Sequence, residues 1–346
     1  MATSAEVRTV LEVLRSHPHK QGWQTFYGVL QTAFVDEEAA GRGILTHVTA
    51  VHHESRPNAT ASHYVSLLCI ALKGVIGDWR DSPVLDESLD MSQRVKLLTA
   101  AAEAGEDEIL DIVLTKQNSF SGARRFLVPQ IIVSHFAHRH GIRVRLADLG
   151  TGAGLLPRQL NDRASFERFS PDLTWESWKP SFVEVDYEQR WGLDRTSPKE
   201  VDWFRQCYGP SAYYDDRYAE LVWAFEQEAV KGAALHTENL DLLDAEAVAR
   251  FVHEHQINVV TCSFVLYQWN PAVRKDVINA VVGSLRAPGL FVSLEPTGDL
   301  LTPGASIRVY LPGDSSPIEV GTVSDGHCIG TVAAGPDFDT FRRDHL

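Results

Sequence analysis

The sequence predicts an α/β protein in two parts, an all-helical N-terminal domain followed by a doubly wound, mostly parallel sheet with helices on both faces. Helical patterns of apolar residues fill the chain as far as about His140. From Arg143 onward, short β-branched runs alternate with helical segments, as in βαβ units. At 346 residues and 44% hydrophobic composition, the chain can form two soluble domains. We predict a helical domain over residues 1–125, serving as a lid or substrate domain, and a ligand-binding α/β domain over 126–346.

Three features define the helical region. The opening segment is an amphipathic helix with Val7, Val10, Leu11 and Leu14 on one face. The most apolar stretch, Tyr64–Trp79, is shorter than the ~20 residues of a membrane span and indicates a buried core helix. A further helix runs up to Gly141, which ends it.

The second half shows short apolar runs separated by helical patterns, and these predict its strands. Leu173–Asp194 suggests an inserted hairpin with strands around Trp175 and Phe182–Val185. Pro-Gly-Asp and Asp-Gly turns near the C-terminus indicate antiparallel strands that close the sheet. The other expected strands are Arg145–Leu149, Ala234–Thr237, Asn258–Ser263 and Gly289–Leu294.

Charge and cysteine content narrow the possible partners. With 32 Lys and Arg against 46 Asp and Glu, the net charge of −14 disfavours nucleic acid and anionic membranes. A small-molecule substrate is therefore expected, and the helical region offers a possible homodimer face. Four scattered cysteines and an N-terminus without a basic, apolar leader indicate a cytoplasmic protein.

The most informative motif follows the first expected strand. Asp148, Gly150, Gly152 and Gly154 form the pattern D-x-G-x-G-x-G before a helix that we expect to run to about Phe169. Glycines allow a positive φ and a close backbone approach to a ligand, and helix-start amides attract anions. A dinucleotide fingerprint would need a third glycine at Leu155, which disfavours NAD. A tight turn without a ligand is the alternative.

This motif resembles the first motif of the class I S-adenosylmethionine (SAM)-dependent methyltransferase superfamily, and the likeness continues downstream. The resemblance implies a Rossmann-like sheet with SAM as cofactor. It implies a ribose contact at Asp194, an adenine contact at Leu240 and Asp241, and a ligand-facing strand end at Ser263.

The ribose carboxylate has alternatives. Asp194 lies 40 positions after Gly154, farther than is usual in that superfamily, and the inserted hairpin would explain the gap. Glu176, Glu184 or Asp186 would otherwise take this role. Asp194 could instead cap a helix over Lys199–Cys207.

A second resemblance covers roughly residues 115 to 340 and is to an uncharacterised bacterial methyltransferase-like family. It rests on Gln117-Asn118, DLGTGAGL, GLDRTSPKEVDWF, ENLDLLDAEAV and FVLYQW. The family typically has an acidic residue after the asparagine, where this chain has Ser119, so any role of that acid is not expected here.

Methyl transfer depends mainly on positioning the acceptor and excluding water. Tyr267 is the first catalytic candidate, because its phenol follows the strand that ends near Ser263, and Trp269 could attract the sulfonium by cation–π contact. Asn118 is the second, as a hydrogen-bonding partner of a substrate amine or carboxylate. Core packing for the aromatic residues and helix capping for Asn118 are the alternatives.

Histidines suggest a metal only weakly. His135 and His138 share a helix face, but no third ligand is positioned with them, so no metal site is expected. His327, in the late Asp-Gly-His turn, could instead reach the cleft.

The sequence therefore favours a SAM-dependent methyltransferase acting on a small molecule. One alternative is a methyltransferase-like enzyme that cyclises SAM itself to a small-ring amino acid of the azetidine or cyclopropane type, releasing methylthioadenosine. Another is a non-catalytic SAM-binding protein.

Overall fold

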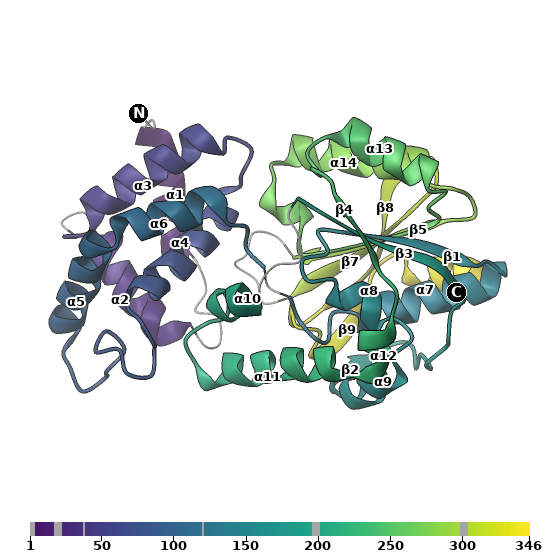
Figure 1. Ribbon diagram of the computed structural model, residues 1–346, viewed down its shortest axis with the longest axis horizontal. Coiled ribbons are helices and arrows are strands. Elements are labelled where there is room, and N and C mark those ends of the chain that lie inside the picture. Colours follow the sequence, from purple (N-terminus) through teal and green to yellow (C-terminus); the bar gives the residue numbers. More distant parts are fainter. Residues whose placement is uncertain (1–3, 17–22, 37–38, 120, 196–200, 298–303) are drawn as a thin grey trace.

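The chain forms a helical part and a sheet-containing part that lie side by side (Figure 1). The computed structural model describes residues 4–16, 23–36, 39–119, 121–195, 201–297 and 304–346. The helical part appears in purple and blue, and the sheet part runs from teal to yellow. The proposed boundary between residues 125 and 126 lies in the turn before α7.

The helical part is organised around α4. This helix is buried along most of its length, and α1, α5 and α6 contact it. Its sequence is the apolar stretch in which we expected a buried helix, and none of the described helices is long and apolar enough to cross a membrane. The helices are α1 (Ser4–Ser16), α2 (Gln24–Phe34), α3 (Arg42–Ser55), α4 (Ala61–Val75), α5 (Met91–Ala104) and α6 (Glu106–Thr115).

The second part is built on one nine-stranded sheet in the order β2-β9-β8-β7-β6-β5-β1-β3-β4. The run from β6 to β4 is parallel, while β7 and β8 continue the sheet in antiparallel pairs. The strands are β1 (Val144–Leu149), β2 (Leu173–Trp175), β3 (Tyr187–Asp194), β4 (His236–Asn239), β5 (Val259–Ser263), β6 (Leu290–Pro296), β7 (Ala305–Leu311), β8 (Asp314–Val323) and β9 (Gly330–Ala334).

The parallel strands confirm the predicted fold class. Read in chain order, their spatial order is 3-2-1-4-5, which is the Rossmann-type arrangement. Alternate residues of the central strands enter two different cores, because successive side chains of a strand point to opposite faces. Val144 and Leu146 of β1 pack on one side, whereas Ala147 and Leu149 pack on the other. Both faces of the sheet are therefore buried.

Helices cover these two faces. On one side lie α13 and α14, and on the other lies α7, joined by α15 (Figure 1). The helices of this part are α7 (Leu127–His140), α8 (Leu155–Gln159), α9 (Arg163–Phe169), α10 (Val201–Cys207), α11 (Ala212–Glu226), α12 (Glu228–Gly232), α13 (Ala245–Glu254), α14 (Pro271–Ser284) and α15 (Phe338–His345), with single turns η1 (Ser170–Asp172) and η2 (Leu266–Gln268).

The predicted hairpin within Leu173–Asp194 is wrong. β2 pairs with β9 at one edge of the sheet, residues 182–185 form no strand, and the second parallel strand is β3. The Asn161 side chain holds the Val185 backbone, accepting its N–H at 2.9 Å and donating to its carbonyl at 2.7 Å. These bonds occupy the groups that a strand ladder would use.

The helix expected to run to about Phe169 is interrupted. α8 ends at Gln159, Asn161 has a φ of 72°, and α9 begins at Arg163. Asp162 caps α9 by accepting the amides of Ala164 and Ser165. The Asn-Asp pair thus ends one helix and starts the next.

The two parts meet at the start of α4 and the loop after β5. The Thr60 hydroxyl donates to the Tyr267 carbonyl at 3.1 Å, and the Thr60 amide donates to the Gln268 carbonyl at 3.0 Å. Farther along α4, the Lys73 ammonium donates to the carbonyls of Gln206 and Tyr208. The helical part therefore supports the loop that carries Gln268.

Replacing Asn161 tests the interruption between α8 and α9. Asn161→Ala removes both bonds to Val185 and places alanine at a positive φ, which alanine tolerates less well than asparagine. The free energy of unfolding should therefore fall by about 2 kcal/mol. Asn161→Gly loses the same bonds without the backbone strain and should be about 1 kcal/mol less destabilised. Urea unfolding of both variants measures this difference. Wild-type stability in Asn161→Ala would contradict it.

Candidate functional site

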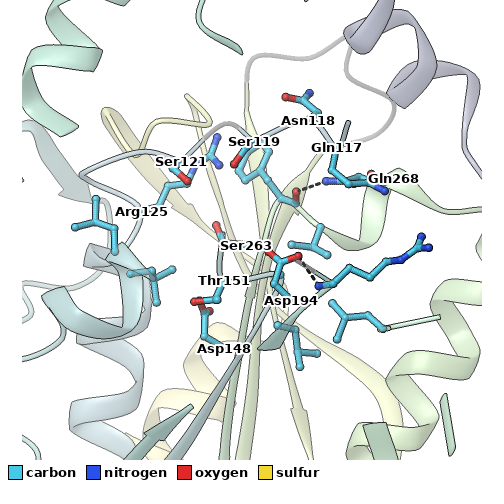
Figure 2. Close-up of a pocket in the computed structure, with 18 of the residues that line it drawn as sticks. Gln117, Asn118, Ser119, Ser121, Arg125, Asp148, Thr151, Asp194, Ser263 and Gln268 are labelled. Atoms are coloured by element: carbon cyan, nitrogen blue, oxygen red, sulfur yellow. Dashed lines mark hydrogen bonds between the residues drawn. The ribbon is translucent and has the colours of Figure 1, made fainter. Parts of the chain in front are cut away.

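A cavity lies where the parallel strands β1, β3, β4 and β5 end. The strand order reverses between β1 and β5, and this switch point is where open α/β sheets bind ligands. Three loops after strands and the glycine turn form most of its wall, and residues 117–119 and 121–125, between α6 and α7, close the remaining side (Figure 2). About 960 Å³ of empty space lies within it, including its open mouth.

The structure gathers most of the predicted site residues in this cavity. Those that line it are Asn118, Asp148, Gly150, Asp194, Asp241 and Ser263, together with Trp269. Those outside its lining are Gly152, Gly154, Leu240 and Tyr267. Gly152 and Gly154 still shape the turn, and the Leu240 amide donates to the Asp194 carbonyl at 3.0 Å.

The glycine turn needs its glycines for different reasons. Gly150, Gly152 and Gly154 all have positive φ. A Cβ on Gly150 would lie 2.4 Å from Val265, so this glycine lets the loop after β5 pack against the turn. A Cβ on Gly152 would instead lie 3.5 Å from the Ser121 hydroxyl and 3.6 Å from that of Ser119. The turn at Gly152 therefore faces the serines of the opposite wall.

Asp194, the last residue of β3, is aimed at the glycine turn. Its Oδ2 accepts the Gly152 amide at 2.9 Å, and its Oδ1 accepts the amide of Arg195 at 2.7 Å. A carboxylate has about four acceptor positions, so it can also accept hydrogen bonds from a ligand. Residues 199 and 200, with which the alternative capped helix would begin, lie outside the described residues.

None of the alternative ribose carboxylates lines the cavity. Asp186 precedes β3, at the opposite end of the strand from Asp194, and pairs with Arg143 at 2.7 Å. Glu184 lies 3.6 Å from Arg163, and Glu176 follows β2 at the far edge of the sheet. Asp194 therefore remains our candidate for this role.

Asp148 is a buried carboxyl group beneath the turn. Thr261 of the neighbouring strand donates to its Oδ1 at 2.7 Å. Burial raises the pKa of Asp148 to about 7, and the nearby charge of Asp194 acts in the same direction. The group therefore changes charge close to neutral pH.

Asp148 should make stability depend on pH. Its pKa is about 7 in the folded chain and about 3.9 when unfolded, so the folded state holds the proton more tightly and stability falls as pH rises between these values. The loss approaches about 1.4 kcal/mol per pH unit within this window. Asp148→Asn should remove it. Urea unfolding from pH 4 to 8 measures both proteins, and parallel stability curves would contradict the assignment.

Glu295, at the end of β6, holds the loop after β5. Its carboxylate accepts three successive backbone amides, those of Val265, Leu266 and Tyr267, at 3.0–3.1 Å. Burial raises the pKa of Glu295, whereas these three amides favour its charged form. The carboxylate thereby fixes the start of η2 and, through it, Gln268 and Trp269.

Replacing Glu295 should loosen this loop. In Glu295→Gln an amide NH₂ group replaces one acceptor oxygen and faces a backbone N–H, so the unfolding free energy should fall by about 1–3 kcal/mol. Glu319→Gln, at a partly exposed carboxylate paired with Arg308, is the control and should lose at most about 1 kcal/mol. Urea unfolding measures both. An equal effect in the two variants would show that the amide bonds to Glu295 contribute little.

Asn118 lies between Tyr267 and the cavity. Its Nδ2 donates to the Tyr267 phenol oxygen at 3.2 Å, and both side chains are buried. Burial raises the pKa of Tyr267, so its phenol stays protonated at neutral pH and is unsuited to act as a base. Within the described structure, Tyr267 reaches the cavity through Asn118.

Two polar atoms of residues in the cavity wall are buried without a hydrogen-bond partner. They are the Asn118 Oδ1 and the Ser263 Oγ. Leaving a buried polar group unpaired costs about 1–3 kcal/mol each. Both residues line the cavity, so a polar ligand bound there can supply the partner that each atom lacks.

The histidines suggested by the sequence lie elsewhere. His135 packs on Trp178, and His140 stacks with Phe136 and His345. His327 contacts the rings of Tyr213 and Tyr214 and does not line the cavity. Among the described residues no group of three or more His, Cys, Asp or Glu is arranged to hold a metal ion.

Sequence reasoning did not find several residues of the cavity wall. Arg125, Ser121 and Thr151 carry polar groups, while Leu242 and Leu243 follow the expected Leu240-Asp241 pair and supply an apolar surface. Thr151 lies inside the glycine motif, so the sequence could have indicated it as a residue of the site. The adjacent arginines in Gly-Ala-Arg-Arg-Phe were a weaker indication.

No protein-family model and no curated protein matches the chain. Solved structures with weak likeness include an O-methyltransferase family protein from Burkholderia thailandensis, with 12% identity, 77% of this chain and 57% of that chain covered, and a TM-score of 0.29. Another is a SAM-bound amino pentose methyltransferase from Micromonospora echinaspora, with 16% identity, coverages of 53% and 62%, and a TM-score of 0.25. A third is a sugar N-methyltransferase from Streptoalloteichus, with 13% identity, coverages of 55% and 60%, and a TM-score of 0.26.

All three are described as methyltransferases, and the glycine motif of this chain resembles the first motif of that enzyme class. The chain spans less than two thirds of the length of each, and every TM-score is below 0.3. Likeness of this degree carries no weight for activity or ligand. The assignment of the fold therefore rests on the strand order of the sheet. Any proposal about function has to be argued from the chain's own residues.

Proposed function

We propose that the chain is a SAM-dependent methyltransferase that acts on a small molecule. The observation that carries this proposal is the meeting of the glycine turn, Asp194 and two residues with unpartnered buried polar atoms, Asn118 and Ser263, in one cavity at the switch point of the sheet. The volume of the cavity is that of a small-molecule site. The net charge of −14 further disfavours a nucleic-acid substrate.

The adenosyl end of SAM would lie over the ends of β3 and β4. Asp194 is positioned to accept hydrogen bonds from the ribose hydroxyls, because the Gly152 and Arg195 amides already orient its carboxylate. Beside it, Asp241 would accept from the adenine amine, and Leu242 and Leu243 would cover the base. The two acceptor carboxylates and the apolar surface thus match the hydroxyls, amine and base of an adenosine.

The amino acid end of SAM would lie toward residues 117–119 and 121–125. Asn118 Oδ1 is an unpartnered acceptor there, suited to an ammonium group. Tyr267 would act on this contact as a positioning residue, because its phenol oxygen accepts the Asn118 amide hydrogen. Gly152, opposite Ser119 and Ser121, keeps the space between turn and wall open.

When bound, SAM supplies a methyl group on a positively charged sulfur, and transfer to a nucleophile leaves the electron pair on that sulfur. The chain's own residues need only orient the acceptor and exclude water. Trp269 offers aromatic surface in the cavity that attracts a cation. With its raised pKa, Tyr267 would donate or accept a hydrogen bond and take no proton from the acceptor.

Substituting Gly152 tests the site. In Gly152→Val the side chain would extend into the space beside Ser119 and Ser121, so SAM affinity should fall by about 100-fold or more, as expected when a close backbone approach is blocked. Isothermal titration calorimetry with SAM and S-adenosylhomocysteine measures this.

Gly141→Val is a matched control. Gly141 has a φ of 61° against 57° at Gly152, and a Cβ there meets no atom within 4 Å. The two variants therefore share the backbone strain, and only Gly152→Val should lose binding. Undiminished SAM affinity in Gly152→Val, or no SAM binding by the wild-type chain, would overturn the proposal.

Product analysis tests the reaction itself. Incubation with SAM and a cell extract should give S-adenosylhomocysteine in excess of a Gly152→Val blank, detected by mass spectrometry. Enzyme-dependent methylthioadenosine and a cyclised amino acid from SAM alone would overturn methyl transfer in favour of cyclisation. Tight binding with neither product would indicate a non-catalytic SAM-binding protein.

A further inference from the structure

Arg125 is a buried cation in the cavity wall. It stands in the turn before α7, with only 6% of its surface exposed, and it lines the cavity near Ser119 and Ser121 (Figure 2). Its neighbour Arg124 is equally buried but turns away, pairing with Asp172 at 2.6 Å and Glu220 at 2.7 Å. Among the described residues, no carboxylate lies within ion-pair distance of Arg125.

The contacts of Arg125 leave its two terminal Nη groups without a hydrogen bond. Its Nε donates to the Gly326 carbonyl at 3.1 Å, and its guanidinium carbon lies 3.8 Å from the centre of the Phe264 ring. Both contacts orient the guanidinium plane, and neither neutralises its charge. Within the described structure, the two Nη groups, which carry four N–H donors, make no hydrogen bond.

Such a cation is unfavourable without a ligand. Burial lowers the pKa of Arg125, yet a guanidinium stays protonated in proteins, so the charge remains. A buried charge is normally paired, because its desolvation is otherwise uncompensated. The missing partner must therefore be an anion that enters the cavity, and the planar fork of the two Nη groups fits a carboxylate best.

The distribution of charge within the cavity supports this assignment. The carboxyl groups of Asp148 and Asp194 lie at the strand ends, on the adenosyl side of the proposed site (Figure 2), and Asp241 follows β4 on the same side. On the wall formed by residues 117–119 and 121–125, Arg125 and the hydroxyls of Ser119 and Ser121 offer hydrogen-bond donors to an anion. A ligand with an anionic group on this wall matches the cavity.

We propose that Arg125 binds a ligand carboxylate through its two Nη groups. The inference rests on the proposed function and deepens it. Two sources share this chemistry, the amino acid end of SAM and an acidic methyl acceptor.

Calorimetry with two ligands distinguishes the sources. SAM and decarboxylated SAM differ only in the carboxylate, so a contact from Arg125 to SAM predicts that Arg125→Met weakens SAM by about 30-fold or more while leaving decarboxylated SAM unchanged. Arg125→Lys, which keeps the charge but loses the fork, should restore part of the affinity. Arg190→Met is the control, because Arg190 has no carboxylate partner among the described residues and lies outside the cavity.

An acidic acceptor predicts a different result. SAM affinity should then be the same in Arg125→Met and wild type, and the complex with S-adenosylhomocysteine should bind acetate or benzoate but not acetamide or benzamide, with binding lost in Arg125→Met. If Arg125→Met equals wild type for SAM and for these carboxylates, the inference is overturned. If wild type binds neither SAM nor decarboxylated SAM, the proposed function fails instead.

Discussion

The attachment of the glycine turn to the end of β3 is the contact on which the rest of the site depends. The amides of Gly150 and Thr151 donate to the Leu193 carbonyl at 2.8 and 3.2 Å, and the Gly152 amide donates to the Asp194 carboxylate. β1 lies between β3 and β5, so these bonds fix the turn relative to both neighbouring strands. The cavity, the position of Asp194 and the wall that faces Ser119 all follow from this attachment.

Buried charge is the second organising feature. Glu295 is stabilised by three backbone amides, which hold the loop after β5, and Arg124 by two carboxylates, which anchor the turn before α7. Arg125 lacks comparable compensation within the described structure and lines the cavity. Its uncompensated burial is what a ligand can relieve, because an oppositely charged group stabilises the charged form. Buried charges that have protein partners therefore stabilise the structure, whereas the buried charge of Arg125 is left for a ligand.

The helical part contributes to the site indirectly. Thr60 begins α4 by accepting the His63 amide, and the same hydroxyl donates to the Tyr267 carbonyl. One side chain therefore both caps a helix and supports the loop that bears Gln268 and Trp269. The connection from α6 then passes along the cavity, where the Trp203 indole donates to the Gln117 carbonyl at 2.9 Å. The helical part and the cavity wall are held by the same few contacts.

The sequence by itself determined the elements whose residues carry a strong local signal. The apolar run of α4, the glycine motif after β1 and the apolar strands β5 and β6 follow from local patterns, because burial on both faces demands continuous apolar residues. β3 escaped prediction because only Gly192 and Leu193 within it are fully buried, so a mostly polar segment forms a parallel strand.

Tertiary structure alone decided which side chains share the cavity. Arg124 and Arg125 are adjacent and chemically identical, yet only the fold sends one to Asp172 and Glu220 and the other into the cavity. In the same way, Tyr267 follows Ser263 closely in sequence but lies behind Asn118 in space. Local patterns specify secondary structure, whereas the contacts of a single side chain depend on residues that lie 48 to 149 positions away in these examples and are brought together by the fold.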